Sequence, residues 1–172
     1  MQNGLARLFW AGLMLLSLGA IGSIALSDGA HAKSPGKTYC INGVCHRVKT
    51  IAEMETMVGY EEEVLASYYD DCKVDKHNPC TEISSGEDFR PDLPDNAASP
   101  VYPNGTILII SYAPTNKQLL VRVNNSGPYK KGRMLDVSRA AAEELGFKKR
   151  GVAKLKVTVI SGPLSQVASQ VK

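Results

Sequence analysis

Two segments in the C-terminal half place an apolar residue at every second position, and this alternation constrains the fold more than any other feature. They are the second half of 117-KQLLVRVNN-125 and 154-KLKVTVIS-161. A period of two is typical of a strand with one buried face. Segment 62–71 has the β-branched and aromatic character of a strand, and segment 105–113 is strongly apolar. The residues predicted to face a common core are Leu119, Val121, Val123, Leu155, Val157 and Val159.

One helix is predicted between the last two strands. Ser138 is a favourable N-cap, residues 139–145 are good helix formers, and Gly146 is a natural stop. By contrast, residues 72–103 contain five prolines and many small polar residues, so an irregular segment is expected there. A mainly β fold with one embedded helix fits a closed barrel of about six strands, because closure leaves no exposed strand edge.

A hairpin and a short helix are predicted before the barrel. In 39-YCINGVCH-46, the Asn-Gly pair predicts a type I′ turn, whose two central residues both need positive φ. Thr50 and Glu53 form a capping box at the start of 50-TIAEMETMVG-59, and Gly59 is a natural end for this helix.

The four cysteines predict two disulfide bonds. Cys40 and Cys45 face each other across the predicted hairpin as a non-hydrogen-bonded pair. The Cα atoms of such pairs lie about 4.5 Å apart, at the short end of the range for a disulfide. Cys72 and Cys80 then close a small loop. The alternative is a zinc site built from Cys72, His77, Cys80 and an aspartate, but an even number of cysteines in an exported chain favours disulfides. We therefore predict no metal and no cofactor.

The first 32 residues have the pattern of a secretory signal peptide. Arg7 provides a positive start, 8-LFWAGLMLLSLGAIGSIAL-26 is apolar, and 30-AHA-32 is a small-residue cleavage pattern. The mature chain is expected to begin at Lys33. The apolar run is almost long enough for an uncleaved anchor, but its glycines and serines favour removal. No cysteine follows the run to carry a lipid, so we expect no membrane anchor after cleavage.

The formal net charge of +3 does not indicate a nucleic-acid partner, because lysines and arginines form no clear patch. The densest basic stretch is 148-KKRGVAKLK-156. We predict that it is a solvated strand edge, which lysines protect from unwanted pairing, rather than a contact for an anionic polymer.

The block 105–160 resembles the rare lipoprotein A (RlpA) family, whose fold is a double-psi β-barrel. The most specific part is 121-VRVNNSGPYKKGRMLDVSRAAAEELG-146, which keeps the order of a loop, an Asp and a capped helix. The resemblance begins earlier, with 66-ASYYDD-71 and 84-SSGEDF-89. The predicted organisation is a signal peptide over residues 1–32, a hairpin and short helix over 33–63, the six-stranded double-psi β-barrel over 64–161, and a flexible tail over 162–172.

The resemblance also implies a set of catalytic positions. Active members of the family are periplasmic lytic transglycosylases, in which a carboxylic acid protonates the glycosidic oxygen and a base activates a sugar hydroxyl. The family's loop acid aligns with Asn125, and the arginine after it aligns with Ser126. Of two upstream acids, the first is kept as Glu87 and the second is Arg90, while the family's histidine is Ser99. An amide keeps the shape of a carboxylate but has no proton to transfer.

Asp136, in 133-RMLDVS-138, is retained. In related double-psi barrels, including expansin-like proteins, an aspartate before the helix is important for action on the wall, so Asp136 and Glu87 are the candidate catalytic residues. The alternative for Asp136 is a carboxylate that binds backbone amides near the helix start, and for Glu87 it is ordinary solvation in a loop. The predicted substrate-binding residues are Asn124, Asn125, Ser126, Ser99 and Tyr129.

Tyrosines are also candidate platforms for sugar faces, although each of them taken singly more often fills a core or rim. They are Tyr68, Tyr69, Tyr102, Tyr112 and Tyr129.

Three functions fit this pattern. The first is a periplasmic protein that associates with peptidoglycan glycan strands without efficient cleavage. The second is an active endolytic lytic transglycosylase that uses Asp136 and Glu87. The third is a module that binds other envelope proteins and ignores glycan. Fold alone does not choose among them.

Overall fold

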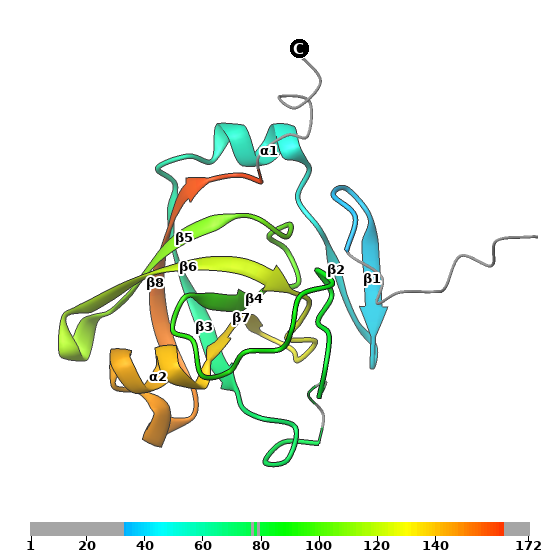
Figure 1. Ribbon diagram of the computed structural model, residues 1–172. Helices are drawn as coiled ribbons and strands as arrows, with labels where there is room; N and C mark the ends of the chain where they lie inside the picture. Colours follow the sequence, from blue (N-terminus) through cyan, green and yellow to red (C-terminus); the bar gives the residue numbers. More distant parts are fainter. Residues whose placement is uncertain (1–32, 77, 79, 164–172) are drawn as a thin grey trace, which may run out of the picture.

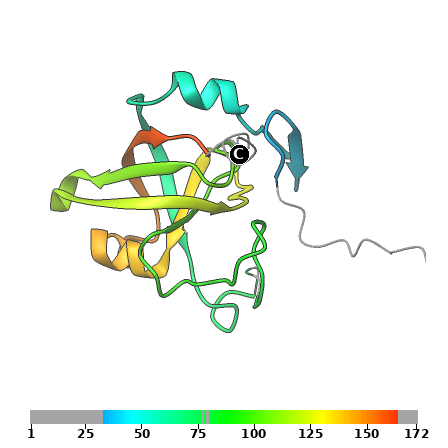
Figure 2. The same ribbon diagram turned by 45° about the horizontal axis from the view of Figure 1, so that its top comes forward.

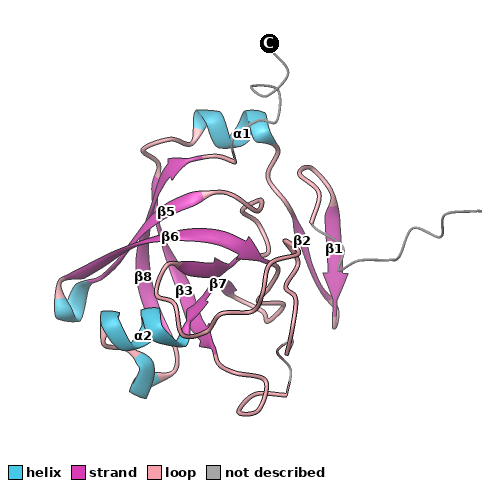
Figure 3. Ribbon diagram, in the orientation of Figure 1, coloured by secondary structure: helices cyan, strands magenta, loops and turns pink. Residues whose placement is uncertain are grey.

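The computed structural model describes residues 33–76, 78 and 80–163, and within them six strands close into a barrel (Figure 1). The strand order around the barrel is β3-β7-β4-β6-β5-β8. Figure 3 shows that strands form most of this body, while the helices lie at its periphery. The prediction of a mainly β barrel is therefore confirmed. The strands are β3 (Glu61–Tyr69), β4 (Asn96–Ala98), β5 (Ile107–Tyr112), β6 (Lys117–Asn125), β7 (Arg133–Ser138) and β8 (Ala153–Ser161).

Two of the strand pairs are parallel, β3 with β7 and β4 with β6, and the other neighbouring pairs are antiparallel. The expectation of an irregular segment over residues 72–103 is wrong at β4, which lies inside that segment. β4 has three residues, too few to show a period of two. The sequence pattern did not indicate β7 either, because its buried Leu135 and Val137 flank only one charged residue, Asp136, which is too short a run to show a period of two.

The core lies inside the barrel and contains the predicted apolar faces. Val121 and Val123 of β6 are buried, as are all three predicted core residues of β8, while Leu119 is partly buried against the same cluster. Burial of this apolar surface is the main source of stability for such a domain. The largest fully buried side chains are Tyr102, Phe147, Met54, Leu108, Ile110, Leu135, Leu145 and Leu155.

The predicted helix is α2 (Arg139–Leu145). Ser138 Oγ accepts a hydrogen bond from the Ala141 amide at 3.0 Å, and Gly146 ends the helix with a φ of 90°. Short 3₁₀ turns occur at η1 (Ala113–Thr115), between β5 and β6, and at η2 (Lys148–Arg150), after α2. The basic stretch 148–156 was predicted to be a strand edge, and this prediction is wrong. Its residues 153–156 belong to β8, which pairs with β3 on one side and with β5 on the other.

The N-terminal hairpin consists of β1 (Thr38–Ile41) and β2 (Val44–Arg47), which form a separate two-stranded sheet beside the barrel (Figure 2). Its register is the predicted one, with Cys40 opposite Cys45 and positive φ at Asn42 and Gly43. The two sulfurs are bonded and the Cα atoms lie 4.0 Å apart. The hairpin leads into α1 (Ile51–Thr56), where both halves of the predicted capping box are present.

Cys72 and Cys80 form the second predicted disulfide. These sulfurs are therefore not metal ligands, and no cluster of His, Cys, Asp and Glu suited to a metal ion occurs in the described chain. None of the described helices is long and apolar enough to cross a membrane. The predicted signal peptide, His77, and residues 164–172 of the predicted tail lie outside the described residues.

Candidate functional site

A band of polar side chains crosses the outer face of the neighbouring strands β6, β4, β7 and β3. Leu135 and Val137 of β7 point into the core, so the residue between them, Asp136, points outward. The same alternation applies in β6, where Arg122 and Asn124 flank the buried Val123. This outward face contains both candidate catalytic regions.

Asp136 is hydrogen-bonded to a serine that the sequence analysis did not single out. Ser67 of β3 is the parallel partner of Asp136, and its Oγ donates to Asp136 Oδ1. Arg133 Nη1 in turn donates to Ser67 Oγ. The carboxylate therefore has a hydroxyl partner and a nearby guanidinium, and no hydrogen bond to the start of α2 occurs among its described contacts. Its alternative role as a ligand of the helix amides is not supported.

Burial raises the pKa of Asp136 above its usual value, and this effect outweighs the lowering by the Ser67 hydrogen bond and by the charge of Arg133. A carboxyl group with a raised pKa retains its proton more readily, which is the property that a general acid needs.

Glu87 is in the opposite electrostatic state. Arg122 holds its carboxylate with two hydrogen bonds of 2.6 and 2.7 Å, and Asn124 Nδ2 donates to it at 3.1 Å. The Arg122 contact is the main cause that lowers the pKa of Glu87 to about 2. Glu87 is therefore an anion at neutral pH with most of its acceptor capacity used, which makes it a poor proton donor.

The structure does not join the two candidate acids. Glu87 is bound to side chains of β6, whereas Asp136 lies on β7, and β4 runs between these strands. Two interstrand spacings correspond to about 10 Å. In the described part of the chain, no hydrogen bond connects Glu87 or its partners to Asp136.

Asn124 lies beneath this surface rather than on it. Only 2% of the residue is exposed, and its Nδ2 donates to Asn96 Oδ1 at 2.9 Å as well as to Glu87. Its Oδ1 is buried without a hydrogen-bond partner. Buried polar groups are normally satisfied, so this oxygen is an acceptor for a small polar group such as water.

Asn125, which the sequence analysis aligned with an acid of the family, uses its side-chain oxygen in two hydrogen bonds. Oδ1 accepts from the amide of Ser126 at 2.8 Å and from that of Ser84 at 3.1 Å. No acceptor for its Nδ2 is found among the described residues, so this position presents an amide donor. The loop that follows turns at Gly127, whose φ of 92° favours glycine.

The other predicted binding residues differ in their accessibility. Ser99 is fully buried, and its Oγ donates to Met134 O at 3.1 Å while accepting from the amides of Val101 and Tyr102. Its hydroxyl is thus occupied by the backbone. Ser126 and Tyr129 are partly exposed on the loop, with Tyr129 beside the ring of His46 at a centroid distance of 6.4 Å.

Sequence reasoning missed three residues of the site: Ser67, Arg122 and Lys33. Lys33 is buried, and its Nζ donates to the carbonyl oxygens of Ser99 and Asn125. The alternation of β6 would have indicated that Arg122 points outward. No local signal identifies Ser67 or Lys33, because their partners are more than 60 residues away.

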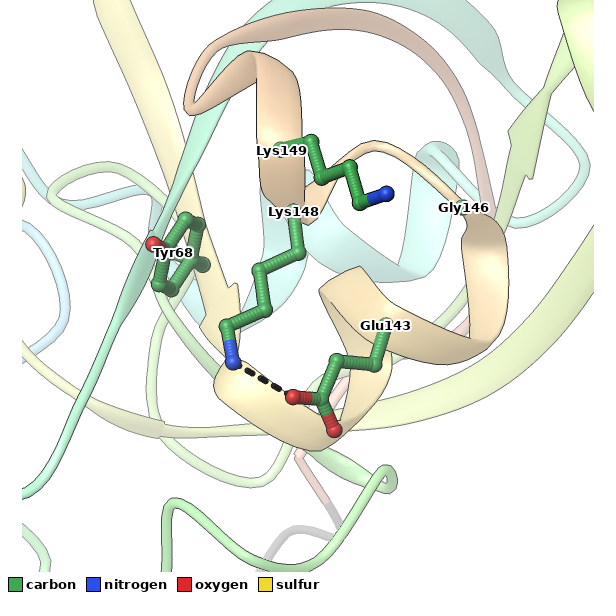
Figure 4. A pocket seen from close by; sticks show the side chains of 5 residues that line it. All are labelled: Tyr68, Glu143, Gly146, Lys148 and Lys149. Carbon is green, nitrogen blue, oxygen red and sulfur yellow. Dashed lines mark hydrogen bonds and ion pairs between the residues drawn. The ribbon is translucent and has the colours of Figure 1, made fainter.

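A separate pocket of about 760 Å³ lies beside α2 and η2 (Figure 4). It is lined by Tyr68, Glu143, Gly146, Lys148 and Lys149, and the Lys148 ammonium bonds to Glu143. Tyr68 is one of the tyrosines predicted as platforms for sugar faces, but none of the predicted catalytic or substrate-binding residues lines this pocket. The polar band on the strands, and not this pocket, is the candidate site.

Of the predicted tyrosine platforms, Tyr69, Tyr102 and Tyr112 are buried in the core, and Tyr68 and Tyr129 remain partly exposed.

The closed barrel with two parallel strand pairs and an outward aspartate before its embedded helix defines a double-psi β-barrel protein. The family model described as lytic transglycolase matches residues 61–157, which is more than half of the chain. The chain belongs to this RlpA-like family.

Several curated relatives carry the name "Endolytic peptidoglycan transglycosylase RlpA". The relative from Pasteurella multocida is 32% identical over 76% of this chain and 43% of its own length. The relative from Rickettsia prowazekii is 34% identical over 71% of this chain and 35% of its own length. The relative from Rickettsia bellii is 31% identical over 84% of this chain and 56% of its own length. The chain thus spans roughly a third to just over half of these relatives. Among solved structures, it is similar to the Streptomyces papain inhibitor, with a TM-score of 0.47 and 19% identity over 60% of this chain and 96% of that one.

Proposed function

We propose that this protein is exported to the periplasm after removal of residues 1–32 and associates with peptidoglycan glycan strands without cleaving them efficiently. Membership of the lytic transglycolase family and the printed name of its relatives support a peptidoglycan-related role. The two disulfides fit an exported chain.

The main support for the absence of efficient cleavage is the side chain of Asn125 and its hydrogen bonds. In the family resemblance this position is an acid, but here an amide fills it and its oxygen is already bonded to two backbone amides. The side chain cannot protonate a glycosidic oxygen. Glu87, the retained upstream acid, is held as an anion by Arg122. Neither residue supplies the proton that departure of the leaving sugar needs.

The same residues are suited to hold a sugar. The Asn125 Nδ2, the Ser126 hydroxyl and the partly exposed Tyr129 ring lie along one loop. Hydrogen-bonding groups beside an aromatic face are the usual composition of a small polar-ligand site. We therefore assign glycan contact to this loop, with Ser99 and Asn124 supporting it from below.

A second function is favoured by Asp136. Its raised pKa makes it the best proton donor on the candidate face. In this alternative the protein is an endolytic transglycosylase in which Asp136 is the acid and Glu87 the base. It requires the strand-borne Asp136, rather than the loop position 125, to reach the scissile bond.

The test is an incubation of the disulfide-bonded protein with purified peptidoglycan sacculi, followed by assays of the pellet and of the soluble anhydro-muropeptides. We expect the protein to pellet with sacculi and to release no anhydro-muropeptides above the background. Release that Asp136→Asn abolishes would instead establish the second function. Absence from the pellet, without release, would exclude both and favour a role in binding other envelope proteins.

The Asn125→Asp variant supplies a matched gain-of-function control. It replaces one amide by a carboxyl in a loop whose backbone is already in place, and we expect release to rise about tenfold or more if this position is the missing acid. Pelleting is expected to stay unchanged.

A further inference from the structure

Lys33 is the most deeply buried charged side chain near the candidate site. Only 4% of the residue is exposed, whereas lysines are rarely buried to this degree without a partner. Its Nζ donates to Asn125 O at 3.0 Å and also to Ser99 O. Among the described residues, Lys33 has no carboxylate partner, and its hydrogen bonds go to these two backbone carbonyls.

The two carbonyls mark the end of the parallel pair β4–β6. Ala98 pairs with Asn125 at the last position of the ladder, and the Ser99 amide donates to Asn125 O at 3.2 Å. Beyond this pair the ladder between β4 and β6 ends, and the loop that follows Asn125 begins. A carbonyl at such a ladder end needs another donor if it is buried. Lys33 donates a hydrogen bond to Ser99 O, just after β4, and another to Asn125 O, at the end of β6, and thereby connects the two strand ends.

The segment that carries Lys33 is also held by backbone hydrogen bonds at the base of the hairpin. The Gly36 amide donates to Val48 O, and the Lys49 amide donates to Val101 O at 2.8 Å. Val48 is fully buried. The hairpin strands make no ladder with the barrel, so these base contacts and Lys33 hold the segment in place.

We propose that Lys33 is a positioning residue of the candidate site: it holds the ends of β4 and β6 together and so fixes the loop that presents Asn125, Ser126 and Tyr129. This inference rests on the proposed glycan-binding role of that loop. It makes the N-terminal segment, which precedes the family match at residue 61, a working part of the site.

The chemistry of the amine fits this role. Burial lowers the pKa of Lys33 to about 7, so a substantial fraction is uncharged near neutrality. A neutral amine has two N–H donors, which matches its two carbonyl acceptors. The contact therefore persists in either protonation state and does not need a buried counter-charge.

Amide hydrogen exchange tests the inference without any ligand. In Lys33→Met, which keeps the length and apolar stem, we expect the Ser99 amide to exchange about tenfold faster, because the carbonyl that it shares with Lys33 is less firmly held. Amides in the middle of β8, such as Val157, are expected to be unchanged. Lys37→Met is the matched control, since Lys37 is exposed in the same segment. Equal acceleration of β8 and Ser99 would mean general destabilisation and would overturn the proposal.

Sacculus pelleting then tests the link to binding. We expect Lys33→Met to bind about tenfold more weakly than wild type and Lys37→Met to bind normally. The Lys33→Cys variant, alkylated with 2-bromoethylamine, regains an amine of almost the same reach and is expected to recover both binding and Ser99 protection. Normal binding by Lys33→Met, or failure of the alkylated protein to recover, would overturn the positioning role. If wild-type protein does not pellet at all, the proposed function fails, while the exchange result still decides whether Lys33 orders the loop.

Discussion

Ser67 and Asp136 face each other across the parallel pair β3–β7, and the Ser67 hydroxyl bridges the Arg133 guanidinium to the Asp136 carboxylate. The residues are 69 positions apart in sequence. This arrangement keeps a carboxylate in a partly buried place at the cost of a raised pKa. Carboxyl groups with raised pKa values are common at functional sites, which makes Asp136 a candidate for one.

Ser67→Ala is predicted to raise the pKa of Asp136 further. The hydroxyl hydrogen bond stabilises the ionised carboxylate, so its loss favours the protonated form. The carboxyl carbon shift of Asp136, followed by NMR through an acid titration, measures the change directly. A pKa that moves down, or does not move, would contradict the assigned role of Ser67.

The pair of Glu87 and Arg122 is predicted to contribute modestly to stability and to lose its contribution in acid. The pKa of Glu87 is lowered to about 2 from 4.5, so the contribution is complete above pH 4.5 and disappears as the pH falls through 2. Both side chains are about 40% exposed, and solvent screening limits the effect of Glu87→Gln to about 1 kcal/mol or less at pH 7. Urea unfolding at several pH values measures it.

Asp92→Asn is the control for that experiment. Its pair with Arg90 is half exposed on both sides, and we expect a change within about 0.5 kcal/mol. If the Glu87→Gln difference is the same at pH 2 as at pH 7, the pairing does not govern the Glu87 titration.

Lys33 predicts a second rise in stability with pH, in a higher pH window than that of Glu87. Its pKa is about 7 in the folded protein and 10.5 when unfolded, so the unfolded state binds more protons between these values. The free energy of unfolding should therefore rise with pH from 7 upward, by at most about 5 kcal/mol. Lys33→Met should remove this rise, and Lys37→Met should retain it. Unfolding curves between roughly pH 6.5 and pH 10.5, which span the window set by the Lys33 shift, are the measurement.

Leu135→Ala is predicted to destabilise the barrel by about 2–5 kcal/mol, because Leu135 is fully buried in the core. Leu120→Ala is the matched control: Leu120 is 58% exposed, and its truncation should change stability by less than about 0.5 kcal/mol. Comparable losses in the two variants would show that β7 does not face the core as described.

Much of the framework was predictable from local patterns. The Asn42–Gly43 turn fixed the hairpin register and hence the first disulfide, and the α2 caps at Ser138 and Gly146 were predicted to the residue. These features depend on neighbours a few positions away, where spacing alone determines which groups meet. β4 and β7 escaped this reasoning because each is short and partly polar.

The amino-acid sequence by itself determined the hairpin and the helix, since each depends on residue type at a local spacing. The double-psi barrel class and the amide of Asn125 in place of an acid followed from the resemblance of the sequence to the RlpA family. Only the tertiary structure decided that Arg122 holds Glu87 as an anion, that Ser67 binds Asp136, and that Lys33 reaches the end of β6. Those contacts join residues at least 35 positions apart. Strand pairing in a closed barrel places them together, and the resulting burial and hydrogen bonds set the charge state of each group.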